Sequence, residues 1–354
     1  MSPVKRHLGT TVMCFTGLLA TAGYATGADF GNGVELHGYG TQTYMQSATN
    51  IYLGADDLGT WNNNFLGLVG TVNLNEKSKL WAQLEASSST TNSAATFTWM
   101  FVDYQVSNDL RAHVGRVKYP LGLYNEIINA KFLQLSSLEP SIYQTAADFV
   151  HDAYNGIGLD YDQHFGSAGK VIWQIYGGNT YDRKPPADSR DRRALGARAT
   201  WETPVDGLRF MVSGYRTQVQ TIADNSYSME DRRFFSVDYV NNGWNFKSEY
   251  ANHTFNGVDS NGYYVQLGRT VAEKWTPFVR LDYVTTNEAQ TSDESFYQKT
   301  FVLGIDYKLE SNLSIRVENH FNQGYALPVA SGEVPQGTGR GSWNMFVVGA
   351  HFIF

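Results

Sequence analysis

The sequence predicts an all-β fold, a transmembrane antiparallel up-and-down β-barrel of about 16 strands. Three observations favour it. Alternation of apolar and polar residues recurs about sixteen times along the chain. The connections between these segments alternate between short turns and longer loops. Charged residues make up 17% and aromatic residues 14% of the chain, whereas charged residues are about 25% of a typical soluble protein.

The alternating segments are interpreted as strands with one apolar and one polar face. In the segment 313–321, Ile315 and Val317 alternate with Arg316 and Glu318. The apolar set should face lipid and the polar set a wet lumen, because a charge on the lipid face costs about 2–4 kcal/mol near the midplane. A soluble barrel with the two faces exchanged is the alternative. The predicted strands are 34–47, 64–74, 79–88, 96–106, 110–117, 155–164, 170–178, 194–202, 208–218, 232–241, 244–254, 262–270, 275–285, 297–309, 313–321 and 343–354.

The connections form two sets. Seven are short and rich in Asn, Asp, Gly and Ser, the residues of tight hairpin turns, and eight are longer on average. Short turns on one side and long loops on the other are typical of outer-membrane barrels. An even number of strands places both ends of the barrel domain on the short-turn, periplasmic side. The loops are expected at 48–63, 89–95, 118–154, 179–193, 219–231, 255–261, 286–296 and 322–342.

Aromatic residues gather at strand ends beside the short turns. Trp244 follows one such turn, Trp275 follows another, and Trp201 and Tyr307 each precede one. Trp and Tyr concentrate at membrane–water interfaces. The series therefore predicts an aromatic girdle on the short-turn side.

The last predicted strand ends in a phenylalanine. Phe346, Val348, Ala350, Phe352 and Phe354 fall on one face of that strand. This pattern resembles the terminal signal by which Gram-negative outer-membrane barrels are recognised for assembly. It implies that Phe354 is an assembly signal and that the barrel assembly machinery is a partner.

Residues 1–28 have the pattern of a secretory signal peptide. Lys5 and Arg6 form a basic start, residues 12–22 are apolar, and cleavage is expected after Ala25 or Ala28. The apolar run is too short for a membrane anchor, the alternative interpretation. Residues 29–354 are then one outer-membrane barrel domain, reached by export through the periplasm, and the only cysteine is lost with the signal. After the signal no run of about 18 apolar residues occurs, so a membrane protein built from helices is not expected.

The long connection 118–154 combines apolar and charged residues. Loops beyond about 12–15 residues are usually functional or disordered, and Tyr124, Phe132 and Ile142 make this one too apolar to stay solvated. We expect the loop, the third on the extracellular side, to fold back inside the barrel and narrow a pore.

The start of this loop carries a family resemblance. The segment Gly115-Arg-Val-Lys118-Tyr-Pro120-Leu-Gly122-Leu-Tyr-Asn-Glu126 resembles porins of the porin O/P and DcaP-like group of Gram-negative outer membranes. The resemblance implies a homotrimer of 16-stranded barrels, each a passive channel constricted by its third loop. Residues 119–154 contain no arginine, which departs from what a phosphate-selective member would show.

The candidate functional residues are charges expected at the lumen or constriction. Loop acids should face wall arginines and hold the loop in place, while inward acids elsewhere outnumber inward cations and favour weak cation selectivity. Arg116 is out of phase; it faces lipid, a neighbouring subunit or, through a bulge at Gly115, the lumen. The pore-lining and constriction residues are Arg111, His113, Lys118, Glu126, Lys131, Glu139, Asp148, Asp152, Arg198, Arg209, Arg280 and Arg316.

The expected function is a channel for small polar solutes and ions, and two other functions are alternatives. A lipid-hydrolysing barrel enzyme would need a Ser–His pair, for which Ser314 or Ser236 with His320 offers only a chance arrangement. A structural or adhesin barrel is the third class. No histidines are paired at metal-ligand spacing, so no metal, no cofactor and no catalytic residue are expected. The net charge of −7 argues against nucleic acid as a partner. Charges in loop 179–193 are best explained by a solvated loop, and contact with lipopolysaccharide phosphates is the less favoured alternative.

Overall fold

The computed structural model describes residues 27–31, 33–88, 93–180 and 189–354. Most of the predicted signal peptide and parts of the predicted loops 89–95 and 179–193 lie outside these ranges. Within them, sixteen long strands follow a two-residue strand β1 (Ala28–Asp29). The long strands are β2 (Val34–Ser47), β3 (Asn64–Asn75), β4 (Ser78–Ser88), β5 (Ser93–Gln105), β6 (Leu110–Lys118), β7 (Ala153–His164), β8 (Lys170–Thr180), β9 (Ser189–Glu202), β10 (Leu208–Thr221), β11 (Tyr227–Asn241), β12 (Trp244–Phe255), β13 (Val258–Arg269), β14 (Trp275–Thr285), β15 (Tyr297–Glu310), β16 (Leu313–Gln323) and β17 (Ser342–Ile353).

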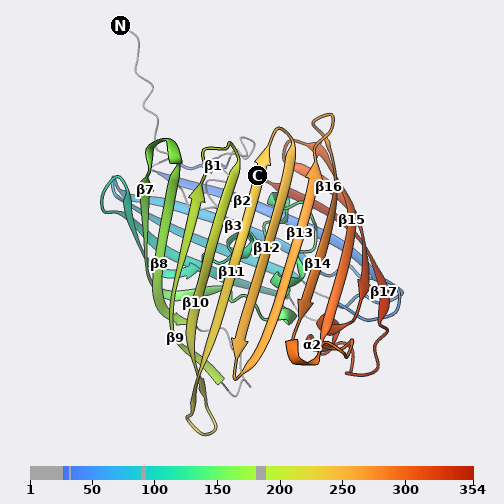
Figure 1. The fold of residues 1–354 in the computed structure, drawn as a ribbon. Coiled ribbons are helices and arrows are strands. Elements are labelled where there is room, and N and C mark those ends of the chain that lie inside the picture. Colours follow the sequence, from blue (N-terminus) through green and yellow to red (C-terminus); the bar gives the residue numbers. More distant parts are fainter. Residues whose placement is uncertain (1–26, 32, 89–92, 181–188) are drawn as a thin grey trace.

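The long strands close into a barrel (Figure 1). Each pairs antiparallel with the strand before and after it, and β17 pairs with β2, placing Val347 opposite Met45. Closure leaves none of the sixteen long strands in the described ranges with an unpaired edge, which a bilayer requires because lipid offers no hydrogen-bond partner. The predicted fold class is confirmed, and each predicted strand coincides with an observed one.

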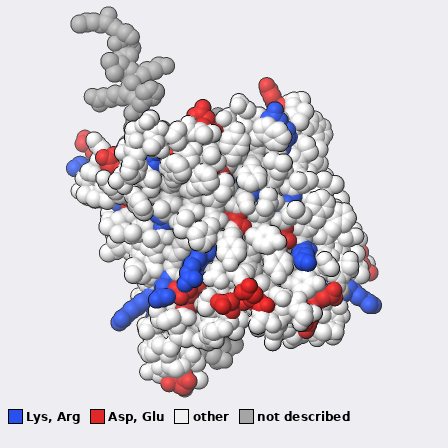
Figure 2. All heavy atoms as spheres, in the orientation of Figure 1, with Lys and Arg blue, Asp and Glu red and all other residues white. Residues whose placement is uncertain are grey.

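The two faces of the wall have opposite chemistry. On β10, the side chain of Val212 is 52% exposed on the outside, whereas the next residue, Ser213, is 4% exposed and points inward. On β9, Leu195 lies outside and Arg198 inside in the same way. In Figure 2 the band between the two rims is mostly uncharged on the visible face, and many of the charged side chains gather toward the loop rim. This outside-apolar pattern suits a lipid environment.

The short turns have the backbone that their sequences predict. Asn242-Gly243, between β11 and β12, has φ of 49° and 77°, the left-handed conformation that Asn and Gly tolerate. The predicted loop 255–261 is wrong in extent, because it contracts to a similar turn, Asn256-Gly257, with φ of 50° and 75°. Strands β12 and β13 extend beyond their alternating apolar segments. Outside the bilayer a strand needs no apolar face, so backbone pairing between the two strands can continue there.

The connection between β6 and β7, residues 119–152, is here called the inner loop. It contains four single 3-10 turns, η1 (Asn125–Ile127), η2 (Lys131–Leu133), η3 (Ser141–Tyr143) and η4 (Thr145–Ala147). In Figure 1 these green turns lie within the ring of strands. The connection between β16 and β17 carries a short helix, α2 (Ala326–Ala330), at the same end as the longer loops. No helix in the described ranges has the length and hydropathy of a transmembrane helix.

Candidate functional site

The inner loop turns away from the wall just after β6. Gly122 has φ of +58°, and a Cβ there would collide with the Tyr143 hydroxyl, so glycine suits this turn on two grounds. Its backbone N–H donates to Ser213 Oγ on β10 at 3.0 Å. Before the turn, Tyr119 stacks on Tyr215 of β10 with ring centroids 4.4 Å apart. The residues in the resemblance segment therefore place the chain against the inner wall.

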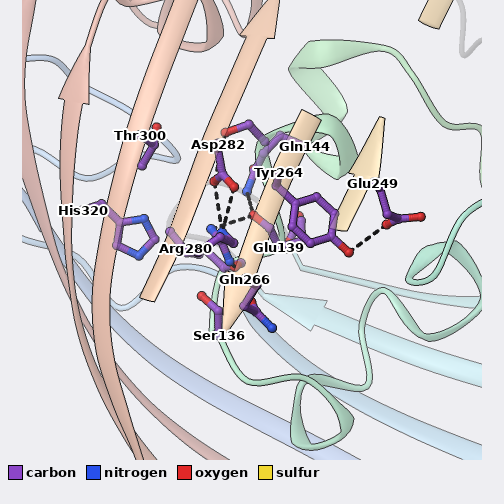
Figure 3. A network of polar contacts seen from close by, with 12 residues as sticks. Ser136, Glu139, Gln144, Glu249, Tyr264, Gln266, Arg280, Asp282, Thr300 and His320 are labelled. Carbon is purple, nitrogen blue, oxygen red and sulfur yellow. Dashed lines mark hydrogen bonds and ion pairs between the residues drawn. The ribbon is translucent and has the colours of Figure 1, made fainter. Parts of the chain in front are cut away.

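A first anchor for the inner loop is Glu249 on β12. Its carboxylate accepts hydrogen bonds from the Leu123 backbone N–H at 2.8 Å and the Tyr143 hydroxyl at 2.7 Å. Two wall hydroxyls, Ser236 at 2.5 Å and Tyr264 at 2.8 Å, complete its shell; Figure 3 shows the Tyr264 bond. Burial, with the neighbouring Glu249 carboxylate adding to it, raises the pKa of the Tyr143 hydroxyl well above its usual range, so that hydroxyl stays a donor.

A second anchor is Arg280 on β14, near the centre of Figure 3. Its Nε donates to both carboxylate oxygens of Asp282 at 3.0 Å. Its other nitrogens donate to the backbone carbonyls of Leu138 at 3.0 Å and Glu139 at 3.4 Å. Asp282 also accepts from Ser141 Oγ at 3.3 Å. The guanidinium thus binds the loop backbone, and not a loop carboxylate as the sequence suggested.

A third anchor lies on β16, where Arg316 and Glu318 are both buried. Arg316 donates to Asp306 at 2.7 Å and to the Lys131 carbonyl of the inner loop at 2.6 Å. Glu318 accepts from Ser136 Oγ at 2.6 Å and from the backbone N–H of Ser137. A wall acid therefore holds loop donors, and a wall arginine holds loop acceptors. This opposite pairing could not be predicted, because it depends on backbone groups of the loop.

Ion pairs between the inner loop and the wall also occur. Glu126 accepts from Arg198 on β9 at 2.6 Å, as the charge pattern predicted. Asp148 pairs with Arg232 on β11 at 3.1 Å. Arg232 was not among the inward charges predicted from the sequence. Arg232 is the first residue of the predicted strand 232–241, and its parity is the same as that of the inward Asp238.

The other charged residues of the inner loop pair with residues of the loop itself or of the adjoining strand β6. Lys131 binds Glu139 within the inner loop. Asp152 binds Lys118 at the end of β6. Arg116 donates to the Thr98 carbonyl at 2.7 Å and lies 3.8 Å from Asp152, so its head turns toward the inner loop. The β5–β6 register is unbroken at Gly115.

Three predicted site residues contact other residues of the barrel wall and not the inner loop. Arg111 lies 3.7 Å from Asp160. His113 lies 2.9 Å from the same carboxylate. Arg209 pairs with Asp238 of the neighbouring strand β11, not with an acid of the inner loop. Adjacent strands supply both partners in each case, so these pairs stabilise the wall.

An open cavity of about 830 Å³ lies between the inner loop, β3 and the connections 48–63 and 324–341. The exposed fractions of its acids are 53% for Asp148, 37% for Asp152 and 16% for Glu139. Since the cavity is on the long-loop side, it forms an entrance to the barrel, here called the vestibule. It is lined by Tyr52, Leu53, Asn63, Phe65, Asn125, Ile128, Asn129, Glu139, Tyr143, Gln144, Thr145, Ala146, Asp148, Val150, His151, Asp152, Ala330 and Ser331.

Metal binding and hydrolysis would each need a group of free polar side chains. Asp148, Glu230 and His253 bring ligand atoms within 4.8 Å of one another, but Arg232 forms ion pairs with both carboxylates and already supplies the positive charge. His320 contacts Glu318 at 3.0 Å. Ser236, one of the serines weighed for hydrolysis, donates to Glu249, so its hydroxyl is committed to a structural bond.

Comparison with solved structures identifies the same fold elsewhere. An outer-membrane expressed OmpT of Vibrio cholerae is 14% identical, with 93% of this chain and 100% of that chain covered and a TM-score of 0.58. The anion-selective porin from Comamonas acidovorans is 13% identical, with 91% and 99% covered and a TM-score of 0.62. The outer membrane channel DcaP of Acinetobacter baumannii is 11% identical, with 93% and 99% covered and a TM-score of 0.59.

At these identities the comparison establishes the fold, which is that of outer-membrane porins. The resemblance to DcaP-like porins is confirmed at this level. No family model matches the chain, and no curated protein matches it either.

Proposed function

We propose that this protein is a passive diffusion channel of the bacterial outer membrane for small polar or charged solutes. The observation that carries the proposal is the inner loop inside a closed barrel, together with the open vestibule beside it. A structural barrel would have no need of a long connection bound at so many points within its lumen. The apolar outer face supports insertion into lipid.

The mechanism follows from the geometry of the loop. It is bound to inward residues of β9, β10, β11, β12, β14, β16 and β17. We expect the passage to lie beside β3, where Phe65 lines the vestibule, and solutes to be selected there by size and by the charges that line the opening. Because both backbone and side chains anchor the loop, it acts as a fixed constriction and not as a gate. No catalytic group, metal or cofactor takes part.

The sign of selectivity follows from the same charges. The vestibule exposes carboxylates, while most of the arginines that contact the loop are buried. We infer weak cation selectivity. The protein would act as a homotrimer, assembled by the barrel assembly machinery and contacting outer-membrane lipid, including lipopolysaccharide.

The test is the electrical behaviour of the purified barrel in a planar lipid bilayer. Stepwise current increases are expected, with a small reversal potential in a KCl gradient whose sign reports preference for K⁺. Protein unfolded before addition is the control. Absence of steps, combined with release of fatty acid from the lipid, would replace the channel by the hydrolase alternative. Absence of both would favour a structural barrel.

A further inference from the structure

The vestibule carries more information than a generic pore entrance, because its charge is arranged in layers. This inference rests on the proposed channel function and concerns its solute. Among the described residues that line the vestibule, three are acids, Glu139, Asp148 and Asp152, and none is lysine or arginine. A solute in the cavity therefore meets carboxylates first.

Each of these acids has a cation behind it. Asp148 is 53% exposed while its partner Arg232 is 0% exposed. Asp152 is 37% exposed, and its two cations, Lys118 and Arg116, are 7% and 26% exposed. Glu139 covers Lys131, which is fully buried. Since Coulomb energy falls with distance and with solvent screening, the nearer carboxylates dominate for a charge that enters the cavity. These cations hold the acids in place, and none of them is among the residues that line the vestibule.

The rest of the vestibule is largely apolar. Leu53, Phe65, Ile128 and Val150 are partly exposed side chains along its lining. A simple inorganic cation gains nothing from such contacts. A solute with an apolar body buries surface there, and an aromatic ring such as that of Phe65 also attracts a cation.

The volume suits a small organic molecule. At about 830 Å³, the vestibule lies within the range of about 300–1,000 Å³ in which proteins bind small molecules. Its opening toward the long-loop side makes it the first compartment that an external solute enters. Binding there raises the local solute concentration above the constriction.

We propose that the vestibule is a binding compartment for small organic amines that carry an aromatic or branched apolar group. The ammonium group lies against Asp148 and Asp152, and the apolar body lies against the side that includes Phe65, Ile128 and Val150. Organic anions of the same shape are disfavoured by the same carboxylates.

The test measures blocking of single-channel current by matched solutes added on the long-loop side. Phenethylammonium combines charge and body, 3-phenylpropionate has nearly the same body with the opposite charge, and ammonium lacks the body. Phenethylammonium is expected to block at a concentration several-fold lower than either of the others. This comparison uses the natural chain and needs no variant. Equal blocking by the amine and the carboxylate would overturn the inference.

Variants then locate the effect. The double substitution Asp148→Asn with Asp152→Asn is expected to weaken amine block roughly threefold or more, since exposed ion pairs contribute modestly. Asp224→Asn makes the same chemical change on an exposed loop acid outside the vestibule, and should leave the block unchanged. Equal weakening in both variants would show a general surface-charge effect and contradict the site.

The outcomes separate this inference from the channel itself. If no current steps occur at all, the proposed function fails and the blocking assay has no signal. If normal steps occur and the amine does not block preferentially, the channel stands and the amine compartment is rejected.

Discussion

Arg198 on β9 donates a hydrogen bond of 2.6 Å to Glu126 of the inner loop, and both side chains are almost fully buried. The two residues are 72 positions apart in the chain. Arg198 also donates to Gln174 on β8. The pair therefore couples the start of the loop to two neighbouring wall strands, β8 and β9.

Breaking this pair should destabilise the loop. Arg198→Gln leaves the Glu126 carboxylate buried without its partner, which typically costs about 3–5 kcal/mol. We expect a lower temperature for the heat-induced mobility change of the purified barrel on gels. Glu126→Gln added to Arg198→Gln should recover part of the loss.

The matched control is Arg216→Gln. Arg216 pairs with Asp231 in the same way, but its side chain is 58% exposed, so little change in the transition temperature is expected because water screens an exposed ion pair. Equal effects of the two arginine substitutions would mean that Arg198 does not hold the loop.

Removing the inner loop should widen the channel. Deletion of Glu126–Asp148 joins two points that already lie close, because Asn125 donates to the His151 carbonyl at 3.0 Å. Single-channel conductance should rise several-fold while the barrel still folds, since the strand pairing does not use the deleted residues. Unchanged conductance in a folded deletion variant would place the loop outside the conducting path.

A side chain at position 38 should disturb the packing of the C-terminal residue Phe354. Phe354 pairs with Gly38 through both backbone groups, at 2.8 Å and 2.9 Å, and its ring occupies the space where a Gly38 side chain would lie. Gly38→Ala should displace that ring, at a typical overpacking cost of about 1–3 kcal/mol, and lower the amount of barrel in the membrane. Gly70→Ala on β3 is the control, because a Cβ there meets nothing within 4 Å.

Phe354 itself should matter more for assembly than for stability. Phe354→Asp is expected to reduce outer-membrane levels in cells strongly, while refolded protein in detergent retains most of its stability. Membrane abundance is measured by immunoblot of outer-membrane fractions. Equal levels of the natural chain and the variant would argue against an assembly signal in this residue.

The oligomeric state is a separate prediction. The wall is shortest at β6, which has 9 residues, the fewest among the sixteen long strands in the described ranges. A low wall beside the short loop 89–95 suits contact with another subunit, and a trimer is expected. Native mass spectrometry of unheated protein should give three chains per particle; a single chain throughout would reject this arrangement.

The sequence alone determined the barrel. Alternation has a period of two, so each strand records which residues face lipid and which face inward, and turn residues mark where each strand ends. These signals are local, and because they recur in every strand they also give the number of strands. They also located the inner loop and the inward direction of Arg198, Arg280 and Arg316.

Only the tertiary structure decided what these inward charges contact. Arg280 and Arg316 bind backbone carbonyls of the loop, and Glu249 and Glu318 accept from its backbone N–H groups. Every residue carries such backbone groups, so no residue type in the sequence marks them in advance. The path of a loop across a lumen depends on many contacts at once, whereas the direction of a strand residue depends only on its parity.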